Sequence, residues 1–371
     1  MSLLFFYMAD FNFENISVKV LNRERITVEE GNWLAEHSNI AQLGNLAHAV
    51  NQFNNGDRVY FNRNIHIEPT NICINHCLFC SYRRRQGQEG SWEYSIDQML
   101  DLAHQAKETD PLLTEFHIVG GVHPDRGLSF YLQLIEKLHQ AFPDIHIKAF
   151  TAEEIVQMCK LEHIDLNEGL KKLHDKGLMS MPGGGAEIFD ASIRRKICPD
   201  KITGDQWLHV HETAHKMGIP TNATMLYGHY DTMQHRINHL DQLRTLQDKT
   251  GMFNAFIPLK FKSGNNKMSH LGEVSIIEDI KTFALTRIFL DNIPHLKAYW
   301  PMLGIDQTLL LLHFGVDDID GTIADTTKIY SMAGGKERPS LSSKQLVNYI
   351  RENQRTPIER DSVYNPIKIY S

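Results

Sequence analysis

Residues 68–82 decide the fold and read Glu-Pro-Thr-Asn-Ile-Cys-Ile-Asn-His-Cys-Leu-Phe-Cys-Ser-Tyr. Cys73, Cys77 and Cys80 form a C-x3-C-x2-C array that follows directly on a short β-type run at 64–68. Thiolates at this spacing can occupy three corners of a cubane iron–sulfur cluster, in which each iron normally takes one protein ligand. One iron is then left open to bind something else. The array therefore predicts a cluster in a catalytic site rather than in a plain electron carrier.

Structural zinc is the alternative for the same three cysteines, with His66 or His76 as the fourth ligand. A zinc site of three cysteines and one histidine usually has its ligands in two pairs on separate knuckles, and the sequence has no second pair. Cys159 and Cys198 have no partner at ligand spacing and are expected to be inert thiols. A zinc-stabilised binding module without enzymatic activity is the alternative from another functional class.

The composition excludes several classes of protein. The chain has 371 residues, of which 42% are hydrophobic and 22% are charged, as in globular proteins rather than disordered or low-complexity chains. Its net charge of −7 argues against nucleic-acid binding through phosphate contacts. Five cysteines, three of them clustered, are too few for a disulfide scaffold and indicate a reducing compartment. No apolar run approaches the roughly 18–20 residues of a membrane span.

We therefore expect a cytoplasmic protein that acts on a small molecule and has neither nucleic acid nor a membrane as a partner. The apolar start of the chain has no basic residues before it, and Asp10 and Glu14 follow at once, which is wrong for a secretory signal. Translation can begin at Met1 or at Met8, and the sequence does not decide between them. It also leaves the oligomeric state open, a homodimer being one option.

From about residue 58 onward, β-type runs alternate with helical patterns, which is typical of βα units on a parallel sheet. Eight such units predict a closed (βα)8 barrel of the TIM type, with the active site at the carboxyl ends of the strands. An open, doubly wound sheet is the alternative. The expected strands are 64–68, 115–119, 145–150, 178–181, 221–227, 253–259, 296–300 and 314–319. The expected helices are 96–107, 128–141, 167–176, 206–217, 233–250 and 278–290.

The same pattern predicts the domain organisation. Residues 57–335 are expected to form the barrel, with an N-terminal helical extension at 1–56. Residues 336–371 are expected to form a C-terminal extension made of a polar loop, a short helix and an extended tail. No linker rich in proline, serine or glycine marks a domain boundary.

Two glycine motifs follow predicted strands. Gly120 and Gly121 end the strand at 115–119, where adjacent glycines let the backbone approach a ligand closely or simply make a tight turn. The second motif, Pro-Gly-Gly-Gly-Ala-Glu at 182–187, lacks the Lys-Ser/Thr of a nucleotide-binding P-loop and fits close backbone packing around a bulky ligand. Its Glu187 binds ribose hydroxyls in one interpretation and forms a structural salt bridge in the other.

The letters His-Glu-Thr-Ala-His at 211–215 match the zinc-protease pattern, but the position of the motif argues against that function. Its helix carries an apolar stripe suited to covering a barrel, so the histidines are expected to face away from the strand ends. A chance match is also more common than usual in a chain with 20 histidines.

Two charged runs have structural explanations beside functional ones. The arginines at 83–85 directly follow the cysteines and predict a solvated basic patch near the docking face of an acidic electron donor. Alternatively, one arginine turns inward and holds a carboxylate by a forked pair. Asp317, Asp318 and Asp320 resemble a hard-cation site but are more typical of turn and cap chemistry.

Cys73, Cys77 and Cys80, with the aromatic Phe79 before the last cysteine, resemble the signature of the radical S-adenosylmethionine (SAM) superfamily. The resemblance implies a [4Fe–4S] cluster whose open iron binds SAM and whose electron releases a 5′-deoxyadenosyl radical from it. SAM is then a cosubstrate. The resemblance also implies that the glycines at 120–121 receive the SAM amino group, and that an external low-potential donor such as flavodoxin or ferredoxin supplies the electron.

Further segments resemble the aminofutalosine synthases, a family of the futalosine route to menaquinone, over about residues 57–335. That family implies addition of the adenosyl radical to the enol-ether double bond of 3-[(1-carboxyvinyl)oxy]benzoate. Aryl migration and loss of carboxylate then give 6-amino-6-deoxyfutalosine. Cyclic dehypoxanthine futalosine synthase, of the same pathway, is the alternative, although the segments at 194–198 and 226–229 look more like the first family. The segments that carry the resemblance are 148–151, 182–189, 194–198, 222–229, 256–259, 290–300 and 317–322.

A substrate with two carboxylates needs cationic partners inside the barrel. By position alone, Lys148, Arg195, His229 and Lys260 are the candidates. The segment 261–266 departs from the proline-containing pattern of the family at this place. No residue is assigned as a proton donor or acceptor.

Overall fold

The computed structural model describes residues 11–334 and 339–370, so the two alternative start residues lie outside the described part. The strands are β1 (Arg58–Ile67), β2 (Glu115–Ile118), β3 (His146–Ala149), β4 (Thr221–Tyr227), β5 (Phe253–Lys260), β6 (His295–Leu296), β7 (Asp318–Ile323), β8 (Thr356–Arg360) and β9 (Pro366–Ile369). The helices are α1 (Phe13–Leu21), α2 (Val28–His37), α3 (Ile40–Asn55), α4 (Ile96–Thr109), α5 (Leu128–Ala141), α6 (Ala152–Leu161), α7 (Leu166–Asp175), α8 (Ala191–Ile197), α9 (Gly204–Lys216), α10 (Met233–Thr250), α11 (Ile276–Phe289), α12 (Trp300–Leu303), α13 (Ile305–Leu311), α14 (Ile329–Met332) and α15 (Ser343–Glu352).

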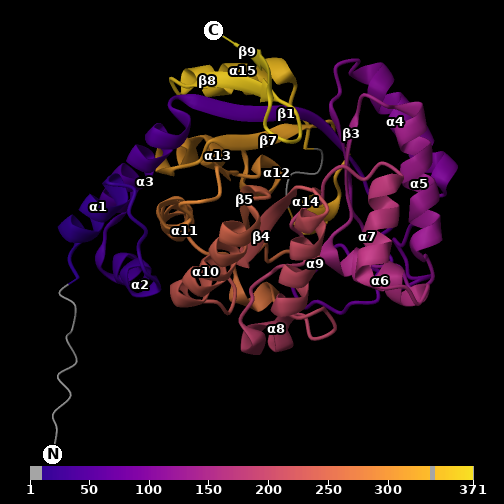
Figure 1. The fold of residues 1–371 in the computed structure, drawn as a ribbon, viewed down its shortest axis with the longest axis horizontal. Coiled ribbons are helices and arrows are strands. Elements are labelled where there is room, and N and C mark those ends of the chain that lie inside the picture. Colours follow the sequence, from indigo (N-terminus) through magenta and orange to yellow (C-terminus); the bar gives the residue numbers. More distant parts are fainter. Residues whose placement is uncertain (1–10, 335–338, 371) are drawn as a thin grey trace, which may run out of the picture.

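The strands close into a barrel of parallel segments surrounded by helices (Figure 1). β1, β2 and β3 lie side by side, β4, β5 and β6 form a second group, and β7 pairs with β1. The segment 178–181 is too short to be a strand by itself, but it bridges β3 and β4 and is the fourth member of the ring. The predicted (βα)8 barrel is therefore confirmed. The isolated parallel bridges that join the two groups are Lys148 to Ser180, Met181 to Thr221 and Lys297 to Asp318.

Side-chain caps determine where the covering helices begin. Ser95 and Thr203 each accept a hydrogen bond from a backbone N–H three residues on, and the side-chain oxygen of the glutamine at that position accepts the backbone N–H of the cap residue. The helices predicted at 128–141 and 233–250 have those bounds, and the other four predicted helices lie within two residues of theirs. Among the described residues, no helix has the length and apolar character that crossing a bilayer requires.

The last barrel strand differs from its predicted position. We expected it at 314–319, but β7 begins only at Asp318. Leu312–Phe314 form a 3-10 turn and Gly315 adopts a left-handed φ of 95° directly after it. The run of leucines before this turn continues the preceding helix, because short apolar runs fit a helix and a strand equally well.

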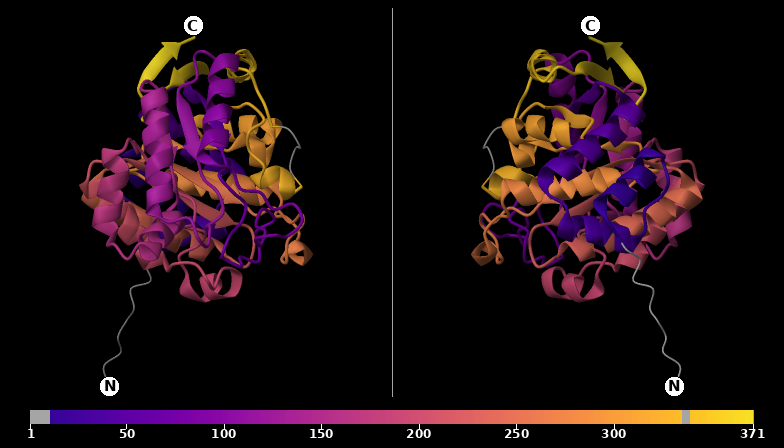
Figure 2. Two further views of the ribbon diagram at one scale, coloured as in Figure 1. Left: turned by 90° about the vertical axis from the view of Figure 1, so that its right-hand side faces the viewer. Right: turned by 90° about the vertical axis from the view of Figure 1, so that its left-hand side faces the viewer.

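The two ends of the chain are joined to the barrel in different ways. α2 and α3 pack against α10 and α11 beside the barrel, where Figure 1 shows them as the indigo helices. β8 pairs in parallel with residues 58–61 of β1, and β9 adds an antiparallel strand, so these two strands project from one end of the molecule (Figure 2). The division into residues 1–56, 57–335 and 336–371 stays a prediction.

Residues alternate between the two faces of β1. Phe61 and Arg63 point outward, toward Tyr370 of the C-terminal segment and toward Glu359 of β8. His66 points inward and stacks on His117 of β2. The inner layers of such barrels are usually filled by branched aliphatic side chains. Here they carry buried charges from four strands, which are Glu115, Lys148, Lys297 and Asp320.

Buried neutral histidines predict that acid destabilises the fold. His239 is fully buried, accepts the backbone N–H of Phe189 at Nδ1 and donates from Nε2 to the carbonyl of Thr224. Burial lowers the pKa of His239 to about 3. The histidine is protonated near pH 6.5 in the unfolded chain but not in the folded chain. The free energy of unfolding therefore falls as the pH drops below about 6.5.

The measurement is urea unfolding between pH 7 and pH 5. His239→Gln is expected to reduce the pH slope by up to about 1.4 kcal/mol per pH unit, the value for one proton. The exposed His209→Gln is the control and should leave the slope unchanged. Equal slopes in the wild type and in the His239 variant would contradict the assignment.

Candidate active site

The loop between β1 and α4 carries the three cysteines and is held from several sides. The Cys73 N–H donates to the Arg84 carbonyl at 3.1 Å, which closes the loop on itself. The N–H of Ile74 binds the carbonyl of Val122 after β2, and that of Leu78 binds Ile197 at the end of α8. The segment after β5 also contributes, since Lys267 donates to the Leu78 carbonyl. The cysteines are therefore fixed at the carboxyl ends of the strands, where a barrel has its active site.

The three thiols are free and are partly exposed as residues. Burial of the sulfur raises the pKa of Cys73 above its ordinary value and that of Cys77 well above it, and the neighbouring Cys80 raises both further. Sulfurs in this position gain most from a cationic ligand that holds them as thiolates. The donor set thus fits an iron–sulfur cluster.

The two histidines that were the alternative zinc ligands lie against other residues. His76 lies on the surface, where its Nδ1 is 2.9 Å from Asp200. His66 lies in the barrel against His117. Within residues 11–334 and 339–370, no three His, Cys, Asp or Glu side chains are close enough to hold a single metal ion. A cluster spreads its ligands over several irons and does not need such a close approach.

The two glycines after β2 make the closest backbone approach to the cysteine loop. A Cβ at Gly121 would lie 2.3 Å from the carbonyl oxygen of Ile72, and one at Gly120 would lie 2.8 Å from that of Thr70. The Gly121 N–H donates to the Thr70 carbonyl at 2.7 Å, and the Gly120 N–H donates to the buried Glu154 of α6 at 3.1 Å. Both N–H groups thus have protein partners. The assignment of these glycines to the SAM amino group stays a prediction.

The triple glycine packs against neighbouring protein atoms, which are backbone at Gly183 and side chains at Gly184 and Gly185. A Cβ at Gly183 would lie 2.6 Å from the carbonyl of Asn222 on β4, and the Gly183 carbonyl accepts the Thr224 hydroxyl. Glu187 follows at a left-handed φ of 48° and forms a buried ion pair with Lys201 at 2.5 Å. The salt-bridge interpretation of Glu187 is therefore the one that the geometry favours.

Lys201 connects this ion pair to the cysteine loop. Its ammonium lies 5.9 Å from the centre of the Phe79 ring. Burial would lower the pKa of Lys201, but Glu187, Cys77 and then other neighbours hold it well above its ordinary value. A largely buried ammonium, on a side chain that is 13% exposed, thus lies near the second cysteine.

The inner wall of the barrel carries a row of polar side chains at one level. His66 of β1 pairs in register with His117 of β2, and His117 with Lys148 of β3. The Lys148 ammonium binds the Glu115 carboxylate at 2.6 Å. Burial alone would raise the pKa of Glu115, but Lys148 and its neighbours hold it well below the usual range. Lys148, predicted as a substrate ligand, thus lies in the barrel with one anionic partner.

The aspartates at 317–320 are ion-pair partners rather than cation ligands. Asp317 binds Arg287 and His295, and Asp318 binds Arg360 of β8 at 2.6 Å. Asp320 binds Lys297 at 2.6 Å. Each carboxylate therefore has a cation from another element, and the pair of Asp318 with Arg360 joins the C-terminal segment to the barrel.

The other three predicted substrate ligands lie apart from Lys148. Lys260 pairs with the buried Asp279 at 2.8 Å, and His229 is buried in the turn after β4, where its Nε2 donates to the Leu226 carbonyl. Arg195 is exposed on α8. Its neighbour Arg194 is buried and donates to four backbone carbonyls, those of Gly185, Ala186, Ile188 and Ile202.

The histidines at 211 and 215 have a structural role. His211 Nδ1 and His215 Nε2 both lie within 2.9 Å of the Thr221 hydroxyl on β4. Glu212, between them, is paired on the surface with Lys216. The two histidines of the zinc-protease pattern therefore attach α9 to β4.

Of the three arginines after the cysteines, Arg85 is exposed. Arg83 turns toward the loop, where its Nε donates to the Cys73 carbonyl at 3.4 Å. One of its terminal nitrogens is buried and has no hydrogen-bond partner in the described structure. Arg83 therefore turns inward but donates to a backbone carbonyl, so the forked pair with a carboxylate stays a prediction, while Arg85 lies on the surface.

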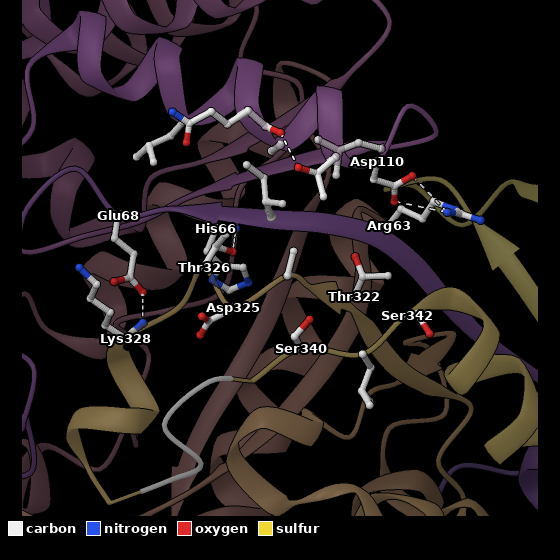
Figure 3. A pocket seen from close by; sticks show the side chains of 18 of the residues that line it. Arg63, His66, Glu68, Asp110, Thr322, Asp325, Thr326, Lys328, Ser340 and Ser342 are labelled. Carbon is white, nitrogen blue, oxygen red and sulfur yellow. Dashed lines mark hydrogen bonds and ion pairs between the residues drawn. The ribbon is translucent and has the colours of Figure 1, made fainter.

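A cavity of about 760 Å³ borders the carboxyl end of β1. Its walls are β1, α4, the segment after β7 and the start of α15. Figure 3 shows Arg63 turned toward Asp110, Glu68 toward the backbone of Lys328, and His66 lying beside Thr326. Burial raises the pKa of Glu68 to about 7.

Sequence reasoning missed Lys201, Lys297 and His117. Lys201 follows a proline and a turn with no motif around it, and its proximity to Cys77 depends on how α8 packs. His117 was within reach, because it occupies the same alternating face of its strand as Glu115. Its pairing with His66 required the register between two strands, which the sequence does not state.

Comparison with known proteins identifies the family of this chain. Residues 67–243 match the model of the radical SAM superfamily, and 250–371 match the CofH/MqnC C-terminal region. The aminodeoxyfutalosine synthase of Thermus thermophilus is 40% identical over 96% of this chain and 96% of its own length. That of Streptomyces coelicolor is 38% identical over 95% and 93%. The 5-amino-6-(D-ribitylamino)uracil–L-tyrosine 4-hydroxyphenyl transferase of Methanopyrus kandleri is 35% identical over 85% and 86%.

Solved structures agree on the fold. The FeFe-hydrogenase maturase HydG from Carboxydothermus hydrogenoformans has a TM-score of 0.74 at 19% identity, over 95% of this chain and 80% of its own. Methylornithine synthase (PylB) has a TM-score of 0.70 at 15% identity, over 91% and 95%. The chain is thus an enzyme of the radical SAM superfamily and belongs to the family that contains the aminodeoxyfutalosine synthases.

Proposed function

We propose that this chain catalyses the aminodeoxyfutalosine synthase reaction. It adds the 5′-deoxyadenosyl radical of SAM to the double bond of 3-[(1-carboxyvinyl)oxy]benzoate, with aryl migration and loss of carboxylate, to form 6-amino-6-deoxyfutalosine. The observation that carries the proposal is the 40% identity with one such synthase over 96% of both chains. A substrate with two carboxylates also suits a barrel whose inner wall carries Lys148 and Lys297.

Cys73, Cys77 and Cys80 are the proposed ligands of the cluster, with Phe79 against it. When bound, the cluster supplies the electron that divides SAM into methionine and the adenosyl radical. The protein holds the three sulfurs in one loop and supplies the buried Lys201 beside them. An external low-potential donor, such as flavodoxin or ferredoxin, is the proposed partner.

Product analysis tests the proposal. Reconstituted enzyme, reductant and SAM are incubated with the enol ether, and the products are identified by mass spectrometry. The expected product contains both the adenosine and the benzoate. Formation of 5′-deoxyadenosine and methionine without this adduct would make the synthase assignment wrong. Parallel incubations with the substrates of the hydroxyphenyl transferase and of cyclic dehypoxanthine futalosine synthase, which is 31% identical in Streptomyces coelicolor, decide between the relatives.

Lys201 is expected to raise the reduction potential of the cluster, because a buried cation stabilises the more negative reduced state. Lys201→Gln should shift the midpoint potential to more negative values, and Glu187→Gln should shift it in the opposite direction. Both variants break a buried ion pair, which costs about 3–5 kcal/mol, so equal thermal destabilisation is also expected. The measurement is an EPR redox titration. Shifts of the same sign in the two variants would refute this role.

A further inference from the structure

We propose that His66 binds the ring carboxylate of the substrate, an inference that rests on the proposed function and names the residue that recognises the aromatic acid. The imidazole belongs to the inner face of β1, which is formed by Asn62, Asn64 and His66. This face precedes the cysteine loop along the chain, because β1 ends at Ile67.

The surroundings of His66 place it inside the barrel. Its ring stacks on His117 of β2 with 4.5 Å between centroids, and it lies 6.4 Å from the ring of Tyr299 after β6. Lys148 of β3 and Asp320 of β7 are its charged neighbours. β3 and β7 flank the pair β1 and β2 on opposite sides, so side chains from both can lie near His66 only across the barrel interior. The residue itself is 7% exposed.

The inner face of β1 carries buried polar atoms that have no hydrogen-bond partner in the described structure. Both ring nitrogens of His66 are buried and have no partner in the described structure, and the same holds for the amide nitrogen of Asn64 and for the amide of Asn62. The orientation of Asn64 is determined, because its Oδ1 accepts the Ile323 N–H at 3.1 Å and its Nδ2 is then the free donor. Unsatisfied buried groups are rare in folded proteins, and three residues with such groups on alternating positions of one strand point to an absent polar ligand that can accept their N–H groups.

A carboxylate is the ligand that these groups suit. It accepts hydrogen bonds only, as the free N–H groups of this face require, and the charges around His66 balance, because Lys148 is paired with Glu115 and Lys297 with Asp320. Burial lowers the pKa of His66 to about 4, so the ring is neutral at pH 7 and always has one N–H to donate. Because the reacting double bond must reach the cysteine loop at the mouth, the ring carboxylate is the one that extends to this depth.

Equilibrium binding tests the inference without requiring turnover. The holoenzyme is titrated calorimetrically with the enol-ether substrate in the presence of SAM and without reductant, and then with 2-phenoxyacrylate, which lacks only the ring carboxylate. His66→Phe keeps an aromatic ring for the stack but removes both nitrogens. It is expected to weaken binding of the benzoate by about 10- to 100-fold, the range for a hydrogen bond to a charged group, and to leave 2-phenoxyacrylate unchanged. Its thermal midpoint should equal or exceed that of the wild type, because buried unpartnered nitrogens are lost.

Two further variants keep the result unambiguous. His66→Gln retains an N–H donor and should recover most of the affinity for the benzoate. His211→Phe is the matched control, since it changes another buried histidine that stacks on an aromatic ring, Trp207, outside the barrel interior. It should alter stability but not the difference between the two ligands.

The outcomes separate this inference from the proposed function. Equal weakening of both ligands by His66→Phe, or unchanged binding of the benzoate, overturns the role of His66 even if the wild type forms the adduct. Selective loss of the benzoate supports that role even if the wild type forms no adduct, in which case the proposed reaction is wrong. Failure of the wild type to bind either ligand also overturns the inference.

Discussion

Replacing Cys77 with alanine is expected to abolish iron binding and SAM cleavage together. Each cysteine holds one iron of the proposed cluster, so the variant keeps only two protein ligands. The remaining thiols are not held as thiolates by their surroundings, because burial raises the pKa of Cys73 and favours the protonated form when no metal is bound. We expect a colourless protein without 5′-deoxyadenosine or adduct, where the wild type is brown and has about four irons per chain. Iron and sulfide assays and mass spectrometry measure the two effects.

Cys198→Ala is the matched control for this experiment. Cys198 is a buried thiol near Lys201, and burial raises the pKa of Cys198 to about 11. It lies outside the cysteine motif. Its loss should leave iron content and product formation at the wild-type level. Retained turnover in Cys77→Ala, or loss of the cluster in Cys198→Ala, would refute the assignment of ligands.

The fold was predictable because local signals and global topology agree. A capping serine or threonine marks the start of α4 and of α9, and hydrophobic periodicity gave six helices within two residues of their bounds. α6 was missed, although Thr151 and Glu154 form a capping box that the sequence displays. β8 was missed for a different reason. It was expected only as an extended tail, and nothing local states that residues 58–61 would accept a further strand.

The candidate site was predictable only as far as chemistry is local. The three cysteines lie within eight positions of one loop, so their spacing alone carries the prediction. The partners of that loop are distant in sequence. Lys201 and Glu187 reach it through the packing of α8 and the turn before it. The inner row of His66, His117 and Lys148 depends on the register of three strands, and side-chain type does not determine register.

The sequence allowed two roles for Gly121, a tight turn or a ligand contact, and the structure gives it a close contact with the cysteine loop. A Cβ at this position would lie 2.3 Å from the carbonyl oxygen of Ile72 and 2.8 Å from its carbonyl carbon. Both are backbone atoms, which cannot rotate away as a side chain can. The same residue donates its N–H to Thr70 at 2.7 Å, so any displacement also breaks this hydrogen bond. The glycine is therefore required for the cysteine loop to close on β2.

Gly121→Ala is accordingly expected to destabilise the fold by at least about 3 kcal/mol and to prevent cluster assembly, although no ligand is removed. The reason is that the displaced atoms lie one residue before Cys73. Thermal unfolding and iron content of the reconstituted protein measure the two losses. Gly31→Ala is the control, because its Cβ would meet only the side chains of Phe289 and Ile237, at 3.0 Å or more, within a helix that favours alanine. A Gly121→Ala protein with a full cluster and unchanged stability would show that the cysteine loop does not require this close approach to β2.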